Sequence, residues 1–321
     1  MLNNDSTTER YAIRARGLRK TFGELAAVDG LELAIRAGEI FGLVGPDGAG
    51  KTTTMRMLCG ILDPDDGEME VAGFDVRRQP EQVKRRIGYM SQRFSLYGDL
   101  TVAENLYFSA RIYNVPRDER LRRERELLGF SRLAPFRDRL AQHLSGGMKQ
   151  KLALACTLMH TPSVLFLDEP TTGVDPVSRR DFWRILYELV QGGVTLFVST
   201  PYMDEAERCN RVALIDRGRI ILCDTPDGLK RRMRGELLEV IAEPLRKANE
   251  IIAGLPGVLG VQVFGERLHL WVEDAAACEE AVRNALIGGQ ITVTGIRRAA
   301  PGLEDVFISV ISGGEHHGDL R

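Results

Sequence analysis

The chain has 321 residues, enough for about two domains. Its net charge is −2 and charged residues make up 27% of it, a composition that argues against both a basic nucleic-acid binder and a disordered chain. Hydrophobic residues make up 44%, which is sufficient for ordinary buried cores.

Five cysteines are scattered along the chain without a C-x-x-C pair. We interpret them as reduced thiols of a cytosolic protein and expect no metal site from them. Residues 1–10 are polar and are expected to be a flexible N-terminus rather than a signal peptide. No run approaches the roughly 18 apolar residues of a membrane span, so we expect any role at a membrane to depend on a partner.

Residues 11–35 alternate apolar and polar side chains around a turn near residues 22–24. This pattern is typical of antiparallel strands. Phe22 lies at the turn, where its ring could stack on an adenine base or pack in a small strand core. The spacing leaves both interpretations open.

Residues 43–54 read LVGPDGAGKTTT, which contains the pattern G-x-x-x-x-G-K-T. Apolar residues precede it and helix formers follow it, and this order of strand, glycine loop and helix predicts a phosphate loop. Glycines let backbone N–H groups turn toward phosphate oxygens, and the helix N-terminus adds partial positive charge. Lys51 is expected to reach the β- and γ-phosphates, and the Thr52 hydroxyl is expected to bind Mg²⁺.

Residues 87–92 predict a strand that ends on Gln92. A glutamine at a strand end near a phosphate loop can bind Mg²⁺ or hold the attacking water. The alternative is a solvated loop residue, and the pattern does not decide between them.

Residues 101–136 predict mostly helix, and Thr101 with Glu104 has the spacing of a capping box. The run RDERLRRERE at residues 117–126 mixes both signs of charge. We therefore interpret it as a solvated helix face rather than a nucleic-acid surface.

Residues 144–148 read LSGGM and open a predicted long helix. At a helix N-terminus, Ser145, Gly146 and Gly147 could form a second anion-binding site. The alternative is an ordinary N-cap preceded by a flexible segment.

The stretch VLFLDE at residues 164–169 is an apolar strand that ends in two carboxylates, as in a Walker B element. Asp168 is expected to hold Mg²⁺, and Glu169 is expected to polarise water.

Composition shifts near residues 231–235. The pattern beyond this point predicts strand, helix, two strands, helix, strand and a final helix, an order that suggests a small α+β domain with a ferredoxin-like sandwich at residues 236–312. No catalytic constellation is visible in it. Residues 313–321 are expected to be a frayed tail.

Four motifs stand in order along the chain: the phosphate loop, LSGGM, VLFLDEP and Gly173-Val174-Asp175. With them the sequence resembles the nucleotide-binding subunit of an ATP-binding cassette (ABC) transporter over residues 11–232. The segments GPDG, SLYGDLTVAENL and LSGGMKQKLALA, with the appended C-terminal domain, are most similar to ATPases of bacterial ABC-2-type exporters. These are the daunorubicin-resistance kind and the first cassette of tandem multidrug-export ATPases.

The resemblance implies an α/β fold with a P-loop NTPase cassette at residues 11–232. This cassette would contain a RecA-like core, an antiparallel β subdomain and a helical subdomain at about residues 93–160. The small C-terminal α+β domain at residues 236–312 would have an accessory or regulatory role.

The resemblance also assigns binding roles toward ATP and Mg²⁺. Phe22 matches the aromatic residue that stacks on adenine, and Gln92 matches the loop that senses nucleotide and contacts the membrane subunit. Glu169 and Gln92 are the expected catalytic residues, and Thr52, Gln92 and Asp168 are the expected metal ligands. The residues expected to bind ATP are Phe22, Gly45, Pro46, Asp47, Gly48, Ala49, Gly50, Lys51, Thr52, Thr53, Ser145, Gly146, Gly147 and Asp175.

In this family two cassettes sandwich two ATP molecules head to tail. Ser145, Gly146 and Gly147 would then close on the γ-phosphate bound by the opposite cassette, and Asp175 would lie in the loop that crosses the dimer interface. The implied partners are a second cassette and an ABC-2-type transmembrane permease, with no nucleic acid. The implied location is the cytoplasmic face of the cell membrane, reached through the permease.

Two positions depart from the family pattern. Met148 stands where the signature usually has glutamine, a change that also occurs among ABC-2 ATPases. Pro201 stands where the family has a histidine that contacts the γ-phosphate, and proline has neither a side-chain donor nor an N–H group. We therefore expect slow hydrolysis at this chain's own site, and a heterodimer with a histidine-bearing cassette is favoured.

The sequence thus predicts an ATP-binding and ATP-hydrolysing subunit that couples cassette dimerisation to export by a separate permease. The alternative is a hydrolysis-impaired partner cassette that binds ATP while a second cassette hydrolyses it. A soluble ABC ATPase of DNA repair or translation is a third class. It is disfavoured because residues 50–145 lack sustained heptads and the chain has a single cassette. The transported substrate is not encoded here, because membrane subunits select it.

Overall fold

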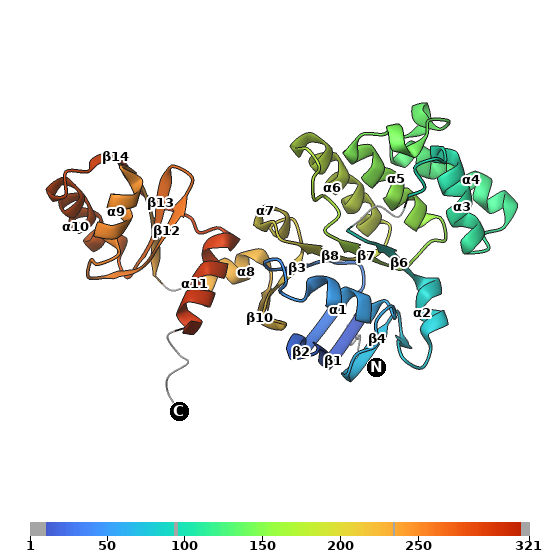
Figure 1. Ribbon diagram of the computed structural model, residues 1–321, viewed down its shortest axis with the longest axis horizontal. Helices are drawn as coiled ribbons and strands as arrows, with labels where there is room; N and C mark the ends of the chain where they lie inside the picture. The colour runs from blue at the N-terminus through green and yellow to red at the C-terminus, as the bar shows by residue number, and fades with distance from the viewer. Residues whose placement is uncertain (1–10, 93–95, 234, 316–321) are drawn as a thin grey trace, which may run out of the picture. The chain divides into compact units, whose positions relative to one another are not determined.

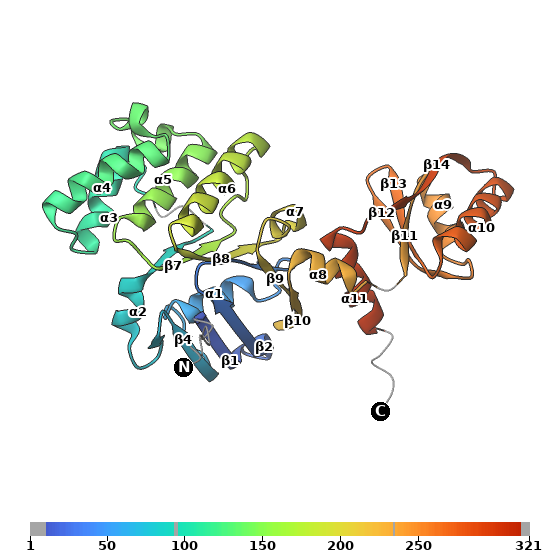
Figure 2. The same cartoon turned by 180° about the vertical axis from the view of Figure 1, so that it is seen from behind.

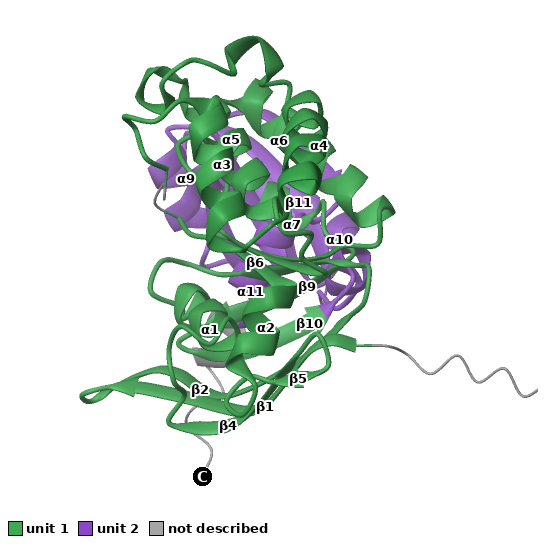
Figure 3. Ribbon diagram, turned by 90° about the vertical axis from the view of Figure 1, so that its right-hand side faces the viewer, with its two compact units in different colours: residues 1–223 green, residues 224–321 purple. Residues whose placement is uncertain are grey.

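The structure is a computed structural model that describes residues 11–92, 96–233 and 235–315 (Figure 1). Contacts within the chain divide it into two compact units, Met1–Cys223 and Asp224–Arg321, which are coloured separately in Figure 3. The flexible N-terminus expected at residues 1–10 lies outside the described residues. Within the described ranges, no helix is both long enough and apolar enough to cross a bilayer.

A six-stranded sheet forms the centre of the first unit, in the order β10-β9-β3-β8-β7-β6. Its strands are β3 (Ile40–Val44), β6 (Ile87–Met90), β7 (Val164–Asp168), β8 (Thr195–Thr200), β9 (Arg211–Asp216) and β10 (Arg219–Asp224). The pairs β3–β8, β3–β9, β6–β7 and β7–β8 are parallel. Every residue of β3, β7 and β8 is buried, and strands buried on both faces have the continuous apolar sequences seen here.

Helices cover both faces of this sheet. The helices of the core are α1 (Lys51–Leu58), α2 (Pro80–Arg86), α5 (Gly146–Leu158), α6 (Pro176–Gln191) and α7 (Met203–Ala206). Figures 1 and 2 show α1 on one face and α5 and α6 on the other. Because β3, β6, β7 and β8 are parallel, their carboxyl ends meet at one edge, where open α/β sheets bind ligands.

An antiparallel sheet in the order β2-β1-β4-β5 packs beside α1. Its strands are β1 (Tyr11–Phe22), β2 (Leu25–Arg36), β4 (Asp66–Val71) and β5 (Phe74–Asp75). The predicted antiparallel strands and their turn are therefore confirmed. One buried core joins this sheet to the phosphate-loop helix, and it includes Ile13, Leu18, Ile35, Phe41 and Met55.

The helical part of the first unit contains α3 (Val102–Ile112), α4 (Arg117–Phe130) and the short 3-10 helices η1 (Ala134–Phe136) and η2 (Ala141–His143). The predicted capping box is confirmed. The Glu104 N–H donates to the Thr101 Oγ1 at 3.2 Å, and the Thr101 N–H donates to a Glu104 carboxylate oxygen at 2.7 Å. Along α4, opposite charges pair within the helix, such as Arg123 with Glu119 at 3.3 Å.

The second unit contains a four-stranded antiparallel sheet in the order β12-β13-β11-β14. Its elements are α8 (Pro226–Arg231), β11 (Glu236–Glu243), α9 (Leu245–Ile252), β12 (Val258–Phe264), β13 (Arg267–Val272), α10 (Ala275–Gly288), β14 (Thr292–Ala299) and α11 (Leu303–Glu315). One face of the sheet shares an apolar core with α9 and α10. The predicted order of strands and helices is confirmed.

Two predicted boundaries differ from the structure. The cassette was expected to end at residue 232, whereas the first unit ends at Cys223, because α8 packs against α11 and so belongs to the second unit. The tail was expected from residue 313, whereas α11 continues to Glu315. Residues 316–321 lie outside the described residues.

Candidate nucleotide-binding site

The phosphate loop connects the end of β3 to the start of α1 at the carboxyl edge of the sheet. Gly48 and Gly50 adopt left-handed backbone conformations, with φ of 79° and 105°. A Cβ atom at Gly50 would lie 2.4 Å from the Ala27 carbonyl oxygen, and one at Gly45 would lie 2.1 Å from the Ile215 carbonyl oxygen. The backbone path therefore requires glycine at these positions.

Lys51 is 4% exposed and its ammonium group lies inside the loop. It donates to the Gly45 and Pro46 carbonyl oxygens at 2.9 and 3.0 Å. It also lies 3.3 Å from a carboxylate oxygen of Glu169, while the exposed Asp47 is 4.0 Å away. The cation is thus held by the loop that carries it and by the strand-end carboxylate opposite.

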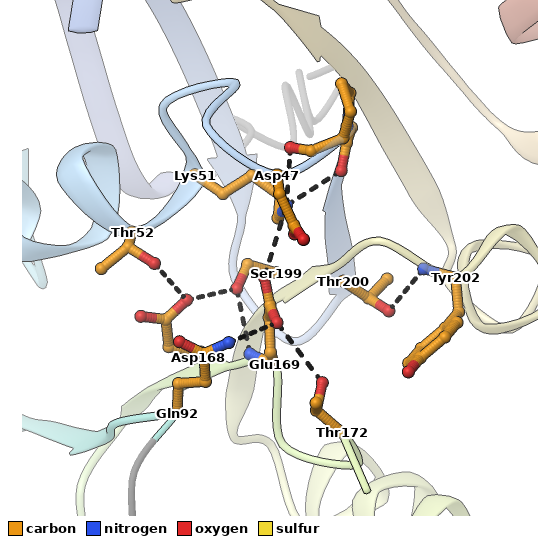
Figure 4. A network of polar contacts seen from close by, with 12 residues as sticks. Asp47, Lys51, Thr52, Gln92, Asp168, Glu169, Thr172, Ser199, Thr200 and Tyr202 are labelled. Carbon is orange, nitrogen blue, oxygen red and sulfur yellow. Dashed lines mark hydrogen bonds and ion pairs between the residues drawn. The ribbon is translucent and has the colours of Figure 1, made fainter.

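Asp168 ends β7 and is 1% exposed. Its Oδ1 accepts hydrogen bonds from the hydroxyls of Thr52 at 3.1 Å and Ser199 at 2.6 Å (Figure 4). Its Oδ2 accepts from the Tyr89 hydroxyl at 3.3 Å. Burial, together with the Asp168 charge, raises the pKa of Tyr89 to about 12, so this hydroxyl stays a donor at neutral pH.

Glu169 follows directly, in a left-handed conformation with φ of 47°. Its N–H donates to the Ser199 Oγ at 3.1 Å. Its carboxylate accepts from the Gln92 amide at 2.8 Å and the Thr172 hydroxyl at 3.3 Å (Figure 4). The unusual backbone conformation turns the carboxylate toward Lys51, on the phosphate-loop side.

The oxygen donors at this edge fit a hard divalent cation. Mg²⁺ in nucleotide sites is bound through one or two carboxylates, hydroxyls and the substrate phosphates. The Thr52 hydroxyl donates to the Asp168 carboxylate. The Gln92 side chain contacts Glu169, the residue that follows Asp168 in the chain. In the described ranges, no group of three His, Cys, Asp or Glu side chains could hold a metal ion by itself.

Ser145, Gly146 and Gly147 lie at the N-terminus of α5. The Ser145 hydroxyl accepts from the Met148 N–H at 3.3 Å, so it caps this helix. A Cβ at Gly147 would lie 2.6 Å from the Ser178 side chain, whereas one at Gly146 would have only the Gly173 carbonyl oxygen nearby, at 3.8 Å. Packing between α5 and α6 therefore explains why residue 147 has no side chain, but it does not explain why residue 146 has none.

Asp175 caps α6, because its carboxylate accepts from the Val177 and Ser178 N–H groups at 3.1 and 2.9 Å. Hydrogen bonds from Ser178, through its side chain and its N–H, hold the pKa of Asp175 below its usual value of 3.8. Among the described residues, no hydrogen bond or ion pair joins Asp175 or the LSGGM segment to the phosphate loop. The chain alone does not bring these two parts of the predicted site together.

Phe22 ends β1 and is 51% exposed, so the interpretation as a core aromatic is wrong. The Lys20 ammonium lies 5.8 Å from its ring centroid. Pro201 directly follows β8, in which Thr200 is paired with Val44, the residue before the phosphate loop. This register places Pro201 beside the start of the loop.

Sequence reasoning missed Ser199 and Tyr89, which contact the two carboxylates. Neither residue was assigned a role from the sequence. The available signal was their place near the carboxyl ends of β8 and β6, at the same edge as the phosphate loop.

Comparison with known proteins agrees with this geometry. The ABC transporter family model matches residues 28–172. Daunorubicin resistance ATP-binding protein DrrA2 of Streptomyces coeruleorubidus is 39% identical over 303 residues, 93% of this chain and 94% of that protein. Probable multidrug ABC transporter ATP-binding protein YbhF of Escherichia coli (strain K12) is 46% identical over 229 residues, 70% of this chain. The match spans only 39% of the length of YbhF.

Among solved structures, the dimeric post-hydrolysis state of the ATP-binding cassette MJ0796, bound to ADP and Pi, is similar with a TM-score of 0.61. It is 25% identical, and the match covers 66% of this chain and 98% of that one. Fold and site together define a P-loop ATP-binding cassette. The chain belongs to the ABC transporter family.

Proposed function

We propose that this chain is the ATP-binding and ATP-hydrolysing subunit of an ABC exporter, which couples ATP-driven cassette dimerisation to transport by a separate membrane permease. The observation that carries the proposal is the convergence of Lys51, Thr52, Asp168 and Glu169 at one edge of the sheet. Support for export comes from two relatives, a daunorubicin resistance ATP-binding protein and a probable multidrug ABC transporter ATP-binding protein.

The residues have distinct roles in this proposal. Backbone N–H groups of the loop from Gly45 to Thr53 and the N-terminus of α1 bind the phosphates, and Lys51 leaves Glu169 to contact the β- and γ-phosphates. Thr52, Asp168 and Gln92 would hold Mg²⁺, which would neutralise charge on the phosphate oxygens. Glu169 and Gln92 orient and polarise the attacking water, and Phe22 stacks on adenine.

A second cassette completes the site. Ser145, Gly146 and Gly147 would face the γ-phosphate bound by the opposite cassette, with Asp175 at the interface between them. Two observations support this: no hydrogen bond or ion pair joins these residues to the phosphate loop within the described ranges, and a Cβ atom at Gly146 would meet no close neighbour there. The similar MJ0796 cassette is a dimer in its structure bound to ADP and Pi, which supports a second cassette as the partner.

A hydrolysis-impaired partner cassette is the second candidate function, and Pro201 favours it. Proline beside the start of the phosphate loop offers no hydrogen-bond donor to a γ-phosphate. In this version the physiological dimer is a heterodimer in which the other cassette hydrolyses ATP. The permease would be of the ABC-2 type, and the chain would lie at the cytoplasmic face of the membrane through it.

Replacing Lys51 tests the nucleotide site. Lys51→Ala removes a charged donor from the phosphates, so the affinity for ATP should fall roughly tenfold to a hundredfold, as expected for loss of a charge-assisted hydrogen bond. Lys84→Ala is the matched control, since Lys84 is a half-exposed lysine paired with Glu81 in α2. Equal affinities of the parent and Lys51→Ala for a fluorescent ATP analogue would contradict the proposed site.

A further inference from the structure

The Asp168 carboxylate accepts three hydroxyl groups from three different elements. Thr52 donates from α1, Ser199 from β8 and Tyr89 from β6. Ser199 makes the shortest of these contacts, at 2.6 Å, and is fully buried. Both carboxylate oxygens are thereby held, so the plane of the carboxylate has a defined orientation.

Ser199 also touches the second carboxylate residue of the site. Its Oγ donates to Asp168 and at the same time accepts the Glu169 N–H at 3.1 Å (Figure 4). The Glu169 N–H donates as well to the Ser199 carbonyl oxygen at 3.1 Å. One serine therefore links the orientation of the Asp168 side chain to the left-handed backbone of Glu169.

We propose that Ser199, assisted by Tyr89, is a positioning residue for the Mg²⁺-nucleotide site: it orients the Asp168 carboxylate toward the metal and holds the Glu169 backbone in place. The inference rests on the proposed function. Neither hydroxyl belongs to the expected metal ligands, unlike that of Thr52. Hydrogen-bond partners that orient metal-binding carboxylates commonly change metal affinity about tenfold to a hundredfold when they are removed.

The competing explanation is that Ser199 only satisfies a buried carboxylate and supports the fold. The two explanations differ in what they predict for Mg²⁺. A purely structural serine affects protein stability alone. A positioning serine affects the coupling between Mg²⁺ and nucleotide, because without it the Asp168 carboxylate adopts several orientations.

The experiment measures the dissociation constant of a fluorescent, non-hydrolysable ATP analogue with Mg²⁺ and with EDTA. The ratio of the EDTA value to the Mg²⁺ value reports the coupling, and it is independent of turnover. In Ser199→Ala the ratio should fall about tenfold to a hundredfold, with the EDTA value within about twofold of the parent. In Tyr89→Phe the ratio should fall in the same direction but less, since its contact is longer.

Thr195→Val is the matched control. Thr195 is a buried residue at the opposite end of β8, where its hydroxyl accepts the Gly38 N–H at 2.9 Å. Its loss should lower the thermal midpoint without changing the Mg²⁺ ratio.

Unchanged ratios in both Ser199→Ala and Tyr89→Phe, with coupling present in the parent, overturn the positioning role and leave the proposed function intact. If Ser199→Ala does not fold, an unchanged ratio in Tyr89→Phe overturns it equally. A parent that binds the analogue in neither condition overturns the proposed function and this inference together.

Discussion

Glu169 contacts three other residues of the candidate site. Its carboxylate is shared by Lys51 at 3.3 Å and Gln92 at 2.8 Å, and its backbone is held by Ser199. Lys51 and Glu169 form a nearly buried ion pair. Binding of phosphates would give Lys51 a new anionic partner and release the carboxylate to act on water.

Pro201 leads to a prediction about turnover. Transition-state charge in phosphoryl transfer is stabilised by preorganised donors, and loss of one donor in a comparable site costs on the order of 10²–10³ in rate. We expect that the parent binds ATP but hydrolyses it slowly. Pro201→His should raise kcat and leave nucleotide affinity unchanged, as measured by steady-state ATPase assays on the purified protein.

The matched control for this prediction is Tyr202→His, which places the same side chain one residue later. The Arg179 guanidinium carbon lies 4.5 Å from the centroid of the Tyr202 ring, so this side chain packs on Arg179. No gain in kcat is expected there. A fast parent with no gain in Pro201→His would show that Glu169 suffices and that the asymmetric-site idea is wrong.

At the scale of elements, three segments of the predicted nucleotide site lie at helix N-termini. α1 begins at Lys51 after Gly50, α5 begins after Ser145 and α6 begins after Asp175. Each N-terminus carries partial positive charge from its unpaired N–H groups. In α6 the Asp175 carboxylate already occupies this place, whereas the Ser145 cap is neutral and leaves the N-terminus of α5 attractive to an anion.

The Asp175 cap predicts a pH dependence of stability. The pKa of Asp175 is lower in the folded protein than its ordinary value of 3.8, because Ser178 hydrogen-bonds the ionised form. Its stabilising contribution is therefore complete above the unfolded pKa and is lost as pH falls through the lower folded pKa.

Asp175→Asn keeps an N-cap but removes this titration. The free energy of unfolding, measured by urea denaturation without nucleotide, should favour the parent at pH 7. That advantage should shrink as the pH falls below about 4, in line with the lowered pKa. A difference between parent and variant that stays constant from pH 7 to pH 3 would contradict the assignment of the cap.

At the scale of the whole molecule, the two units have separate cores. The core that joins the antiparallel sheet to α1 includes Ile13 and Met55, whereas the core of the second unit includes Leu238 and Leu270. Among the described residues, none belongs to both cores. The predicted nucleotide-site residues all lie in the first unit, so we predict that the site forms without the second unit.

Truncation tests this independence. A protein that ends at Cys223 should bind the fluorescent ATP analogue with an affinity within about twofold of the full chain, since no site residue is removed. Circular dichroism and a cooperative thermal transition would establish that the truncated protein folds. A folded truncated protein that does not bind nucleotide would show that the second unit supports the site.

The sequence alone determined the parts of this protein that depend on local backbone chemistry. The phosphate loop and the Walker B strand were predictable, because each depends on residues that are neighbours in the sequence. These are glycines that adopt positive φ, a lysine at the start of a helix, and an apolar strand that ends in carboxylates. The capping box at Thr101 and the order of elements in the second unit were predictable for the same reason. The roles of the site residues in binding ATP and Mg²⁺ and in hydrolysis stay predictions.

Only the tertiary structure decided which side chains from distant segments meet. Ser199 lies 31 residues from Asp168, and Tyr89 lies 79 residues from it, yet both hydroxyls converge on one carboxylate. Sequence spacing does not specify which of these side chains meet, because their contacts depend on the order and register of parallel strands. The assignment of α8 to the second unit has the same origin, since its packing partner α11 lies far along the chain.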